Sequence, residues 1–298
     1  MSRDKKHQAA TLPAIVTPSD YELEAIREIH ATLEPDDTWL GRVKTRAYDA
    51  YNAATDQLRR IPGFDWTVEN VVGGILNLIN EITQDWVPQS TVFGRFAEQG
   101  HTVVDLADIR GLDLASADAV SESLPTTYRN IAAVEGAATG YVGLAGIATD
   151  IVALVALNLR AAGETATSYG FDISRDEERF FALSLLDRVA QPSTKAKNLT
   201  LSPMVSLTNR LARQQAFELL EQAALNGAIS RITKSLGIHL TRAKLAQIAP
   251  VTGAVVGGGY NAYYTSRVCK TARLLYRRRF LMDKYGSAVV ERYERTVD

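Results

Sequence analysis

The sequence predicts an all-α protein, and three observations support that class. Apolar residues recur at the three- and four-residue spacing of a helix face in successive segments. Proline, glycine and serine stand at the boundaries of these segments, where helices begin and end. No segment shows the two-residue alternation of a half-buried strand. We therefore expect a flexible lead-in over residues 1–18 and a single multi-helix domain over residues 19–298.

The composition is that of a globular chain. Hydrophobic residues make up 46% and charged residues 22%, which excludes a disordered chain. The mean hydropathy of -0.09 is too low for a protein with many membrane spans. The formal net charge of -1 conceals an acidic segment over residues 20–37 and a basic segment over residues 267–295. The two segments suit pairing with each other, or contact of the basic one with an anionic surface.

The N-terminal third predicts three amphipathic helices. The first is SDYELEAIREIHATLE, in which Ser19 and Glu22 have the spacing of a capping box and which Pro35 ends. DDTWLGRVKTRAYDAYNAATDQLRR is the second, and Pro62 stops it. DWTVENVVGGILNLINEITQDW is the third, and Pro88 stops it.

Glycine, proline and serine residues later in the chain mark further helix ends. Residues 90–124 contain glycines and border a proline, and we expect this region to be broken. Gly170 is expected to end one helix in the left-handed conformation, and Gly286 to end another in the same way. Between them, Ser174 and Glu177 have the spacing of a second capping box.

Two long apolar stretches, residues 136–159 and 249–266, are rich in glycine. We expect each to form a helix whose glycines share one face, because glycine on a single face allows two backbones to approach closely. Asp150 and Asn261 would then lie near the seam between the two helices. The glycines assigned to this packing are Gly136, Gly140, Gly143, Gly253 and Gly257.

Two other interpretations of these stretches are less favoured. A membrane span would place Asp150 in the middle of the first stretch, at a cost of about 2.5–3.5 kcal/mol on insertion scales. The second stretch holds Pro250 and Asn261 within only eighteen uncharged residues. A phosphate loop would need a lysine after its glycines and a preceding strand, and neither is present.

The sequence shows no catalytic constellation. Its four histidines are scattered and no metal-ligand spacing occurs, so we expect no metal and no cofactor. Cys269 stands between cations that could activate a thiolate, but a half-buried small residue is the favoured interpretation. Four polar residues in apolar surroundings need partners, which a structural network or a ligand pocket would supply. They are Asp150, Asn158, Glu164 and Asn261.

The stretch RLLYRRRF near the C-terminus interleaves arginines with apolar side chains. Such a helix suits an anionic lipid surface or a membrane-protein partner, and pairing with the acidic segment is the alternative. The arginines concerned are Arg273, Arg277, Arg278 and Arg279. We expect no nucleic-acid binding, because the sequence pI is about 6.5. A lone cysteine and the lack of an apolar signal region favour the cytoplasm, and contact of the basic helix with lipid would make the protein peripheral to a membrane.

The two glycine-rich stretches resemble the EcsC protein family. The first matches its glycine-rich helix with Asp150-Ile151, running to the Tyr-Gly-Phe-Asp at residues 169–172. The second matches its Ile-Pro-x-x-Gly-Ala signature, except that Ala249 separates Ile248 from Pro250. The resemblance implies a bacterial protein. The family takes its name from a bacterial operon that also encodes an ABC transporter implicated in protein secretion, so an association with membrane processes is what the resemblance implies. No reaction and no catalytic residues follow from the resemblance.

These observations lead to three functional hypotheses. The first is a non-enzymatic helical interaction module that acts at the cytoplasmic membrane face with a transport or secretion system. An alternative is a protein that binds or processes a hydrophobic ligand or lipid in a pocket around Asp150 and Asn261. A weaker alternative is an effector that inserts its apolar helices into a membrane. The ligand, the partner and the oligomeric state do not follow from the sequence.

Overall fold

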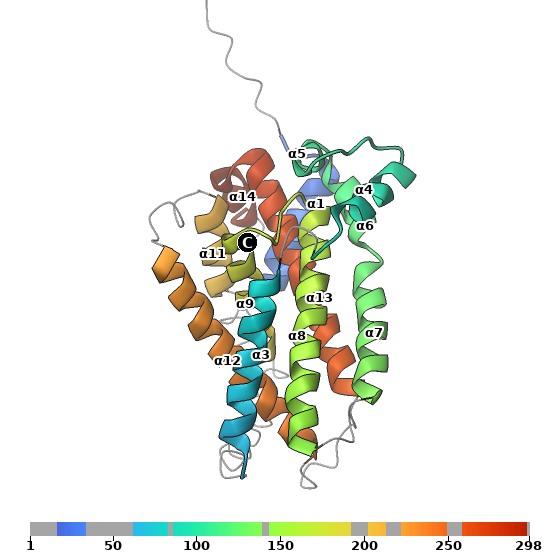
Figure 1. The fold of residues 1–298 in the computed structure, drawn as a ribbon. Helices are drawn as coiled ribbons and strands as arrows, with labels where there is room; N and C mark the ends of the chain where they lie inside the picture. Colours follow the sequence, from blue (N-terminus) through green and yellow to red (C-terminus); the bar gives the residue numbers. More distant parts are fainter. Residues whose placement is uncertain are drawn as a thin grey trace, which may run out of the picture.

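The computed structural model describes residues 17–33, 62–82, 86–138, 143–191, 202–212, 222–248 and 258–296. Every regular element within these ranges is an α-helix, so the predicted fold class is confirmed (Figure 1). The second expected helix, at residues 36–60, lies outside the described residues, as do residues 1–16 of the expected lead-in.

The long helices lie side by side and the short ones gather mainly at one end (Figure 1). In chain order the helices are α1 (Asp20–Leu33), α3 (Phe64–Glu81), α4 (Gln89–Glu98), α5 (Leu106–Arg110), α6 (Leu114–Ser121), α7 (Leu124–Ala138), α8 (Gly143–Ser168), α9 (Asp176–Ala190), α11 (Ser202–Ala212), α12 (Gln222–Ile248), α13 (Gly258–Tyr285) and α14 (Ser287–Glu294). The α8 helix packs against α3, α7, α9, α12 and α13, while α13 also packs along α7 and α9. These two helices are therefore at the centre of the fold.

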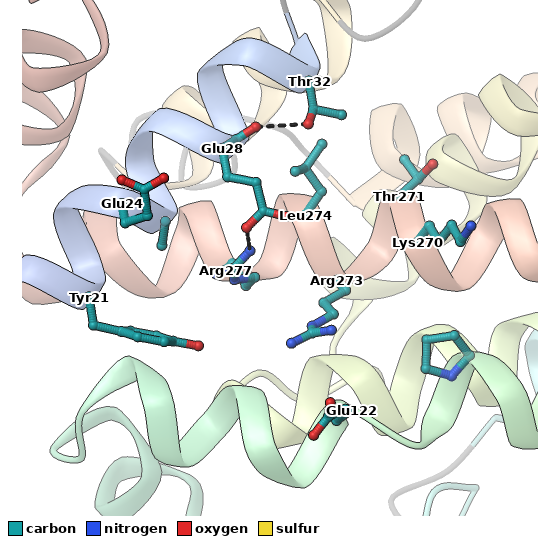
Figure 2. Close-up of a pocket in the computed structure, with 12 residues that line it drawn as sticks. Tyr21, Glu24, Glu28, Thr32, Glu122, Lys270, Thr271, Arg273, Leu274 and Arg277 are labelled. Atoms are coloured by element: carbon teal, nitrogen blue, oxygen red, sulfur yellow. Dashed lines mark hydrogen bonds and ion pairs between the residues drawn. The ribbon is translucent and has the colours of Figure 1, made fainter. Parts of the chain in front are cut away.

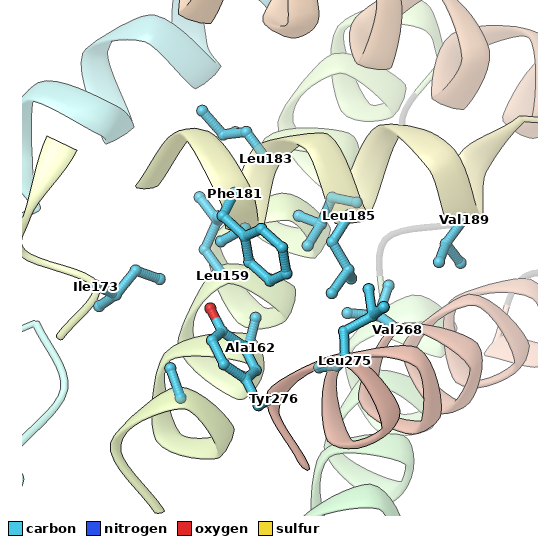
Figure 3. Packing of buried hydrophobic residues seen from close by; sticks show 14 of the residues in the cluster. Leu159, Ala162, Ile173, Phe181, Leu183, Leu185, Val189, Val268, Leu275 and Tyr276 are labelled. Atoms are coloured by element: carbon cyan, nitrogen blue, oxygen red, sulfur yellow. The ribbon is translucent and has the colours of Figure 1, made fainter. Parts of the chain in front are cut away.

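A single large apolar cluster joins the two ends of the described chain. It runs from Ile26 of α1 through the central helices to Val290 of α14. Figure 3 shows Phe181 of α9 beside Tyr276 of α13 and Leu159 of α8. Because α1 and α14 contribute to the same cluster as α8, the N- and C-terminal helices depend on one core.

The helix ends follow several of the sequence predictions. Ser19 and Glu22 form the expected capping box, in which the Ser19 backbone N–H donates to Glu22 at 2.9 Å and the Glu22 N–H donates to Ser19 Oγ at 3.3 Å. Gly170 has φ +81°, and the backbone N–H groups of Phe171 and Gly170 donate back to the last turn of α8. This is the Schellman arrangement that glycine permits. Gly286 ends α13 as expected, but with φ +85° and ψ +147° it is not in the left-handed helical conformation, and α14 begins at the next residue.

The region from residue 90 to residue 124 is broken as expected, because the chain there forms only the short helices α4, α5 and α6. Asp105 caps α5, since its carboxylate accepts from the backbone N–H groups of Ala107 and Asp108. One local prediction is wrong. The predicted capping box at Ser174 does not form. The Asp172 carboxylate accepts from the Ser174 N–H in a turn, and α9 begins at Asp176 without a side-chain cap.

The first glycine-rich stretch is not one helix. The α7 helix ends at Ala138 and α8 begins at Gly143, so Gly136 and Gly143 belong to different helices. Glycine costs a helix about 1 kcal/mol relative to alanine, which makes a glycine-rich stretch a favourable place for a helix to end. Gly140, Gly253 and Gly257 lie outside the described residues.

Other glycines provide the close helix contacts. A Cβ at Gly74 of α3 would lie 2.6 Å from Val152 of α8, and one at Gly163 would lie 2.6 Å from Val87. At Gly237 of α12 a Cβ would lie 3.0 Å from Val72 of α3. Glycine therefore sets the spacing of α3, α8 and α12.

Candidate functional site

A cleft of about 750 Å³ opens between α1, α13 and the junction of α6 with α7. We call it the α1–α13 cleft (Figure 2). Each wall contributes charged side chains. The carboxylates are Glu24 and Glu28 of α1 and Glu122 after α6, and the cations are Lys270, Arg273 and Arg277 of α13. Ala25, Pro125 and Leu274 add apolar surface.

The three cations share one side of α13 because their spacings of three and four residues correspond to about one helical turn each. Their exposure falls along the helix. Lys270 is exposed, Arg273 keeps 32% of its side chain accessible, and Arg277 keeps 8%. The three cations thus form a row along the cleft, and their side chains become more buried toward Arg277 (Figure 2).

Arg277 is held between two carboxylates. Its Nη1 donates to Glu28 Oε2 at 2.7 Å, and its Nη2 lies 3.0 Å from Asp118 Oδ2. Burial lowers the pKa of Arg277, but the charge of Asp118 and the hydrogen bond to Glu28 outweigh it, and the net shift is upward. The Glu28 side chain is 63% exposed, whereas that of Asp118 is 3% exposed. One partner is therefore a surface group and the other is part of the core.

Asp118 joins three helices beneath the cleft. Tyr21 of α1 donates to its Oδ2 at 2.7 Å, and Tyr169, just after α8, donates to its Oδ1 at 2.5 Å. Burial, together with the hydrogen bond to Asp118, raises the pKa of Tyr21 to about 12. Both phenols therefore remain protonated donors at neutral pH, and the floor of the cleft is fixed.

Two of the arginines that line the cleft each have a buried donor with no hydrogen-bond partner within the described part of the chain. These donors are the Nε atoms of Arg273 and Arg277. A buried donor without a partner costs roughly 1–3 kcal/mol, and a group that supplies an acceptor would recover that free energy. The pair of unpaired guanidinium donors is the chemical feature that distinguishes this cleft.

The other two predicted arginines face the interior. Arg278 forms a double hydrogen bond with Glu294 of α14 at 2.7 and 2.8 Å. Arg279 donates to Glu178 of α9 at 2.6 Å, and both side chains are buried. Consecutive helical residues project about 100° apart, so the four arginines cannot share a face. Of the predicted cluster, only Arg273 and Arg277 line the cleft.

The predicted pairing of the acidic and basic segments does occur. Glu22 of α1 accepts from Lys284 Nζ at 2.8 Å and from the Tyr285 hydroxyl at 2.6 Å. Together with the Glu28–Arg277 pair, these bonds fasten α1 along α13. The same contacts hold α1 in place as one wall of the α1–α13 cleft.

Asp150 and Asn261 meet between α8 and α13, near the seam where they were expected. The Asn261 amide donates to Asp150 Oδ1 at 3.4 Å. Lys244 of α12 pairs with the same carboxylate, and both charged side chains are buried. Sequence reasoning missed Lys244, because its position on a separate helix gave no signal.

Asn158 and Glu164 make separate contacts further along α8. The Asn158 amide donates to Thr265 Oγ1 at 3.0 Å. Glu164 accepts from the Tyr128 hydroxyl at 2.5 Å and from Arg95 at 3.2 Å. None of the four predicted pocket residues lines the α1–α13 cleft. The partners named above are protein groups, which is the structural network that the sequence left as one alternative.

Three further features bear on function. Cys269 is buried, and burial raises the pKa of its thiol to about 12. No group of three or more His, Cys, Asp or Glu side chains suited to a metal occurs among the described residues. Within that part of the chain, Ala145–Ser168 of α8 is long and apolar enough to cross a membrane. Half of its most apolar window is buried, and helices in the core of a globular protein pass the same test.

Comparison with known proteins identifies relatives in Bacillus subtilis strain 168. The uncharacterised protein YdbA is 28% identical over 185 residues, which cover 60% of this chain and 63% of YdbA. The match therefore spans less than two thirds of that relative. Protein EcsC is 24% identical over 179 residues, covering 60% of this chain and 70% of EcsC. No solved structure matches the chain. The family model of the EcsC protein family matches residues 64–281, and the chain belongs to that family.

Proposed function

We propose that the chain is a non-enzymatic helical interaction module that acts at the cytoplasmic face of a membrane, beside a transport or secretion system. The observation that carries this proposal is the row of Lys270, Arg273 and Arg277 in the α1–α13 cleft. An open cleft with cations along one wall suits the recognition of an anionic group.

Binding rather than catalysis is favoured by the state of the groups in and beneath the cleft. Arg277 pairs with Glu28 and Asp118, and Tyr21 donates to the same Asp118. Such pairing fixes the positions of these side chains. The hydrogen bond to Asp118 also keeps the Tyr21 phenol protonated, so Tyr21 is a poor base near neutral pH. Cys269, the only cysteine, is buried with a raised pKa and is not among the lining residues.

An anionic membrane is the favoured surface because the outermost cations are accessible. Lys270 is exposed and Arg273 is one-third exposed, so both can meet lipid phosphates without unfolding. Each basic residue near an anionic surface contributes about 1 kcal/mol, and this contribution decreases with salt.

Co-sedimentation of the full chain with vesicles tests this proposal. We expect binding to phosphatidylglycerol vesicles at low salt, little binding to phosphatidylcholine vesicles, and loss of binding as salt increases. Lys270→Glu should weaken the binding. Arg129→Glu is a matched charge reversal at an exposed position of α7 that does not line the cleft, and it should have little effect. Absence of binding to anionic vesicles at low salt would overturn the proposal.

A further inference from the structure

We propose that the α1–α13 cleft contains a phosphate subsite formed by Arg273 and Arg277, and that Glu28 is the group which an incoming phosphate displaces. This inference rests on the proposed function and names the ligand chemistry of its site. The ligand is a phosphomonoester or phosphate anion, whether carried by a lipid headgroup or free in solution.

The donors for such an anion are already in place. Arg273 and Arg277 are four residues apart on α13, so their backbones are separated by about 6 Å along the helix axis. Each has a buried Nε donor with no partner within the described ranges. Both side chains line the same cleft, and Figure 2 shows them on the same side of α13. A phosphate has enough oxygens to accept from both guanidinium groups at once, which a single carboxylate does less well.

Glu28 is the exchangeable partner of Arg277. Its carboxylate accepts from Arg277 Nη1 at 2.7 Å, yet 63% of its side chain is exposed. Because the Glu28 carboxylate is largely in solvent, its pair with Arg277 contributes less free energy than a fully buried pair would, and a stronger anion can replace the carboxylate. Asp118 is buried and is bound by Tyr21 and Tyr169, so it stays and keeps Arg277 in place.

The remaining charges of the cleft set the selectivity. Glu24 and Glu122 repel anions, while Lys270 at the entrance attracts them. A ligand therefore needs more than one negative charge to displace Glu28 against these carboxylates. Leu274 and Pro125 offer apolar contact beside the cations, which suits an anion attached to a carbon skeleton.

Titration of the full chain with inorganic phosphate, and with vesicles of phosphatidic acid or phosphatidylglycerol at equal charge, tests the inference. We expect phosphatidic acid to bind more tightly than phosphatidylglycerol, and phosphate to compete where equal ionic strength of chloride does not. Arg273→Gln should weaken phosphatidic acid binding by about tenfold. This variant is chosen over a change at Arg277, because Arg277 is the nearer cation of the buried Asp118, at 3.0 Å against 4.0 Å for Arg273.

Glu28→Gln provides the decisive comparison. Removal of the competing carboxylate should tighten phosphatidic acid binding by roughly fivefold. Glu24→Gln removes the same charge one turn earlier on α1, where Glu24 repels anions but pairs with the exposed Arg27 and not with Arg277, so it should tighten binding by less than twofold. Tightening by Glu28→Gln with free-phosphate binding assigns the site to phosphate in general. Tightening only on vesicles assigns it to a lipid headgroup.

The two proposals can fail separately. If the chain binds anionic vesicles but Glu28→Gln and Glu24→Gln behave alike and phosphate does not compete, the subsite is wrong and the membrane module stands. If the chain binds free phosphate but no vesicle, the subsite stands and the membrane role is wrong. If it binds neither, both proposals are overturned.

Discussion

The guanidinium group of Arg279 lies 4.1 Å from the ring centroid of Phe171 while its Nη1 donates to Glu178 at 2.6 Å. The ring centroid of Phe181 lies 4.8 Å from the same guanidinium group. Burial alone would lower the pKa of Arg279, but Glu178 outweighs it and the shift is upward. The contact holds the C-terminal third of α13 against α9 in the apolar core.

Arg279→Leu is expected to destabilise the protein by about 3–5 kcal/mol, because it leaves the Glu178 carboxylate buried without a partner. Urea denaturation measures the free energy of unfolding. Replacement of both partners, Arg279→Leu with Glu178→Gln, should cost less than the sum of the single changes. Arg27→Ala at the exposed Glu24 pair is the control and should cost about 0.5 kcal/mol or less. A loss below about 1 kcal/mol in Arg279→Leu would contradict this account.

Gly73 and Gly74 are neighbours in α3 with opposite expected responses to alanine. A Cβ at Gly73 meets nothing within 4 Å, so Gly73→Ala should stabilise the helix by about 0.5–1 kcal/mol. A Cβ at Gly74 would lie 2.6 Å from Val152 Cγ2, and the stiff χ1 of a helical valine resists adjustment. Gly74→Ala should therefore destabilise by about 1–3 kcal/mol. Thermal denaturation of the pair checks the sign of each change, and equal responses would show that α3 and α8 are further apart than described.

Glu22 gives stability a defined pH dependence. Burial raises the pKa of its carboxyl, but hydrogen bonds from Lys284, Tyr285 and Ser19 outweigh it and lower the pKa from 4.5 to about 2. This contribution is therefore fully present above about pH 4.5 and is lost as the pH falls toward 2. After allowance for solvent screening it is about 1–2 kcal/mol. Urea denaturation between pH 7 and pH 3 should show a smaller loss in Glu22→Gln than in the wild type, and identical pH profiles would contradict the assignment.

Cys269 should be inert in the folded protein. Burial raises the pKa of its thiol to about 12, and thiolate is the reactive form. We expect a chromogenic disulfide reagent at pH 8 to modify the native chain at least about 100-fold more slowly than the urea-unfolded chain. Rapid modification of the native protein would contradict this prediction and would support the alternative that neighbouring cations activate the Cys269 thiolate.

Helix class and helix ends were the predictable part of this fold. Periodicity predicted α1 and α3. The local backbone demands of Ser19 predicted the cap of α1, and those of Gly170 and Gly286 predicted where α8 and α13 end. Such signals are readable because each depends on only a few neighbouring residues. The capping box predicted at Ser174 does not form, because the nearby Asp172 carboxylate accepts the Ser174 N–H that Glu177 would have accepted.

The cleft was not predictable, because its walls come from residues far apart in the chain. The arginine cluster was visible, but the sequence did not show which members turn toward Glu28 and which toward Glu178. The position of each member around the helix separates them in retrospect: Arg273 and Arg277 are one turn apart and line the cleft together. The packing glycines were missed because Gly74 and Gly237 are inconspicuous beside the glycine-rich stretches.

The bonds between α1 and α13 impose an order on biosynthesis. Glu28 and Arg277 are 249 residues apart, and Glu22 and Lys284 are 262 residues apart. At about 5–20 residues per second, a ribosome makes the partners of α1 some 12–50 s after α1 itself. Ile26 and Ile29, which are buried in the finished protein, have no α13 to pack against during that interval. The α1 helix is thus among the last to dock, and a nascent chain arrested before α13 presents an apolar stripe that chaperones can recognise.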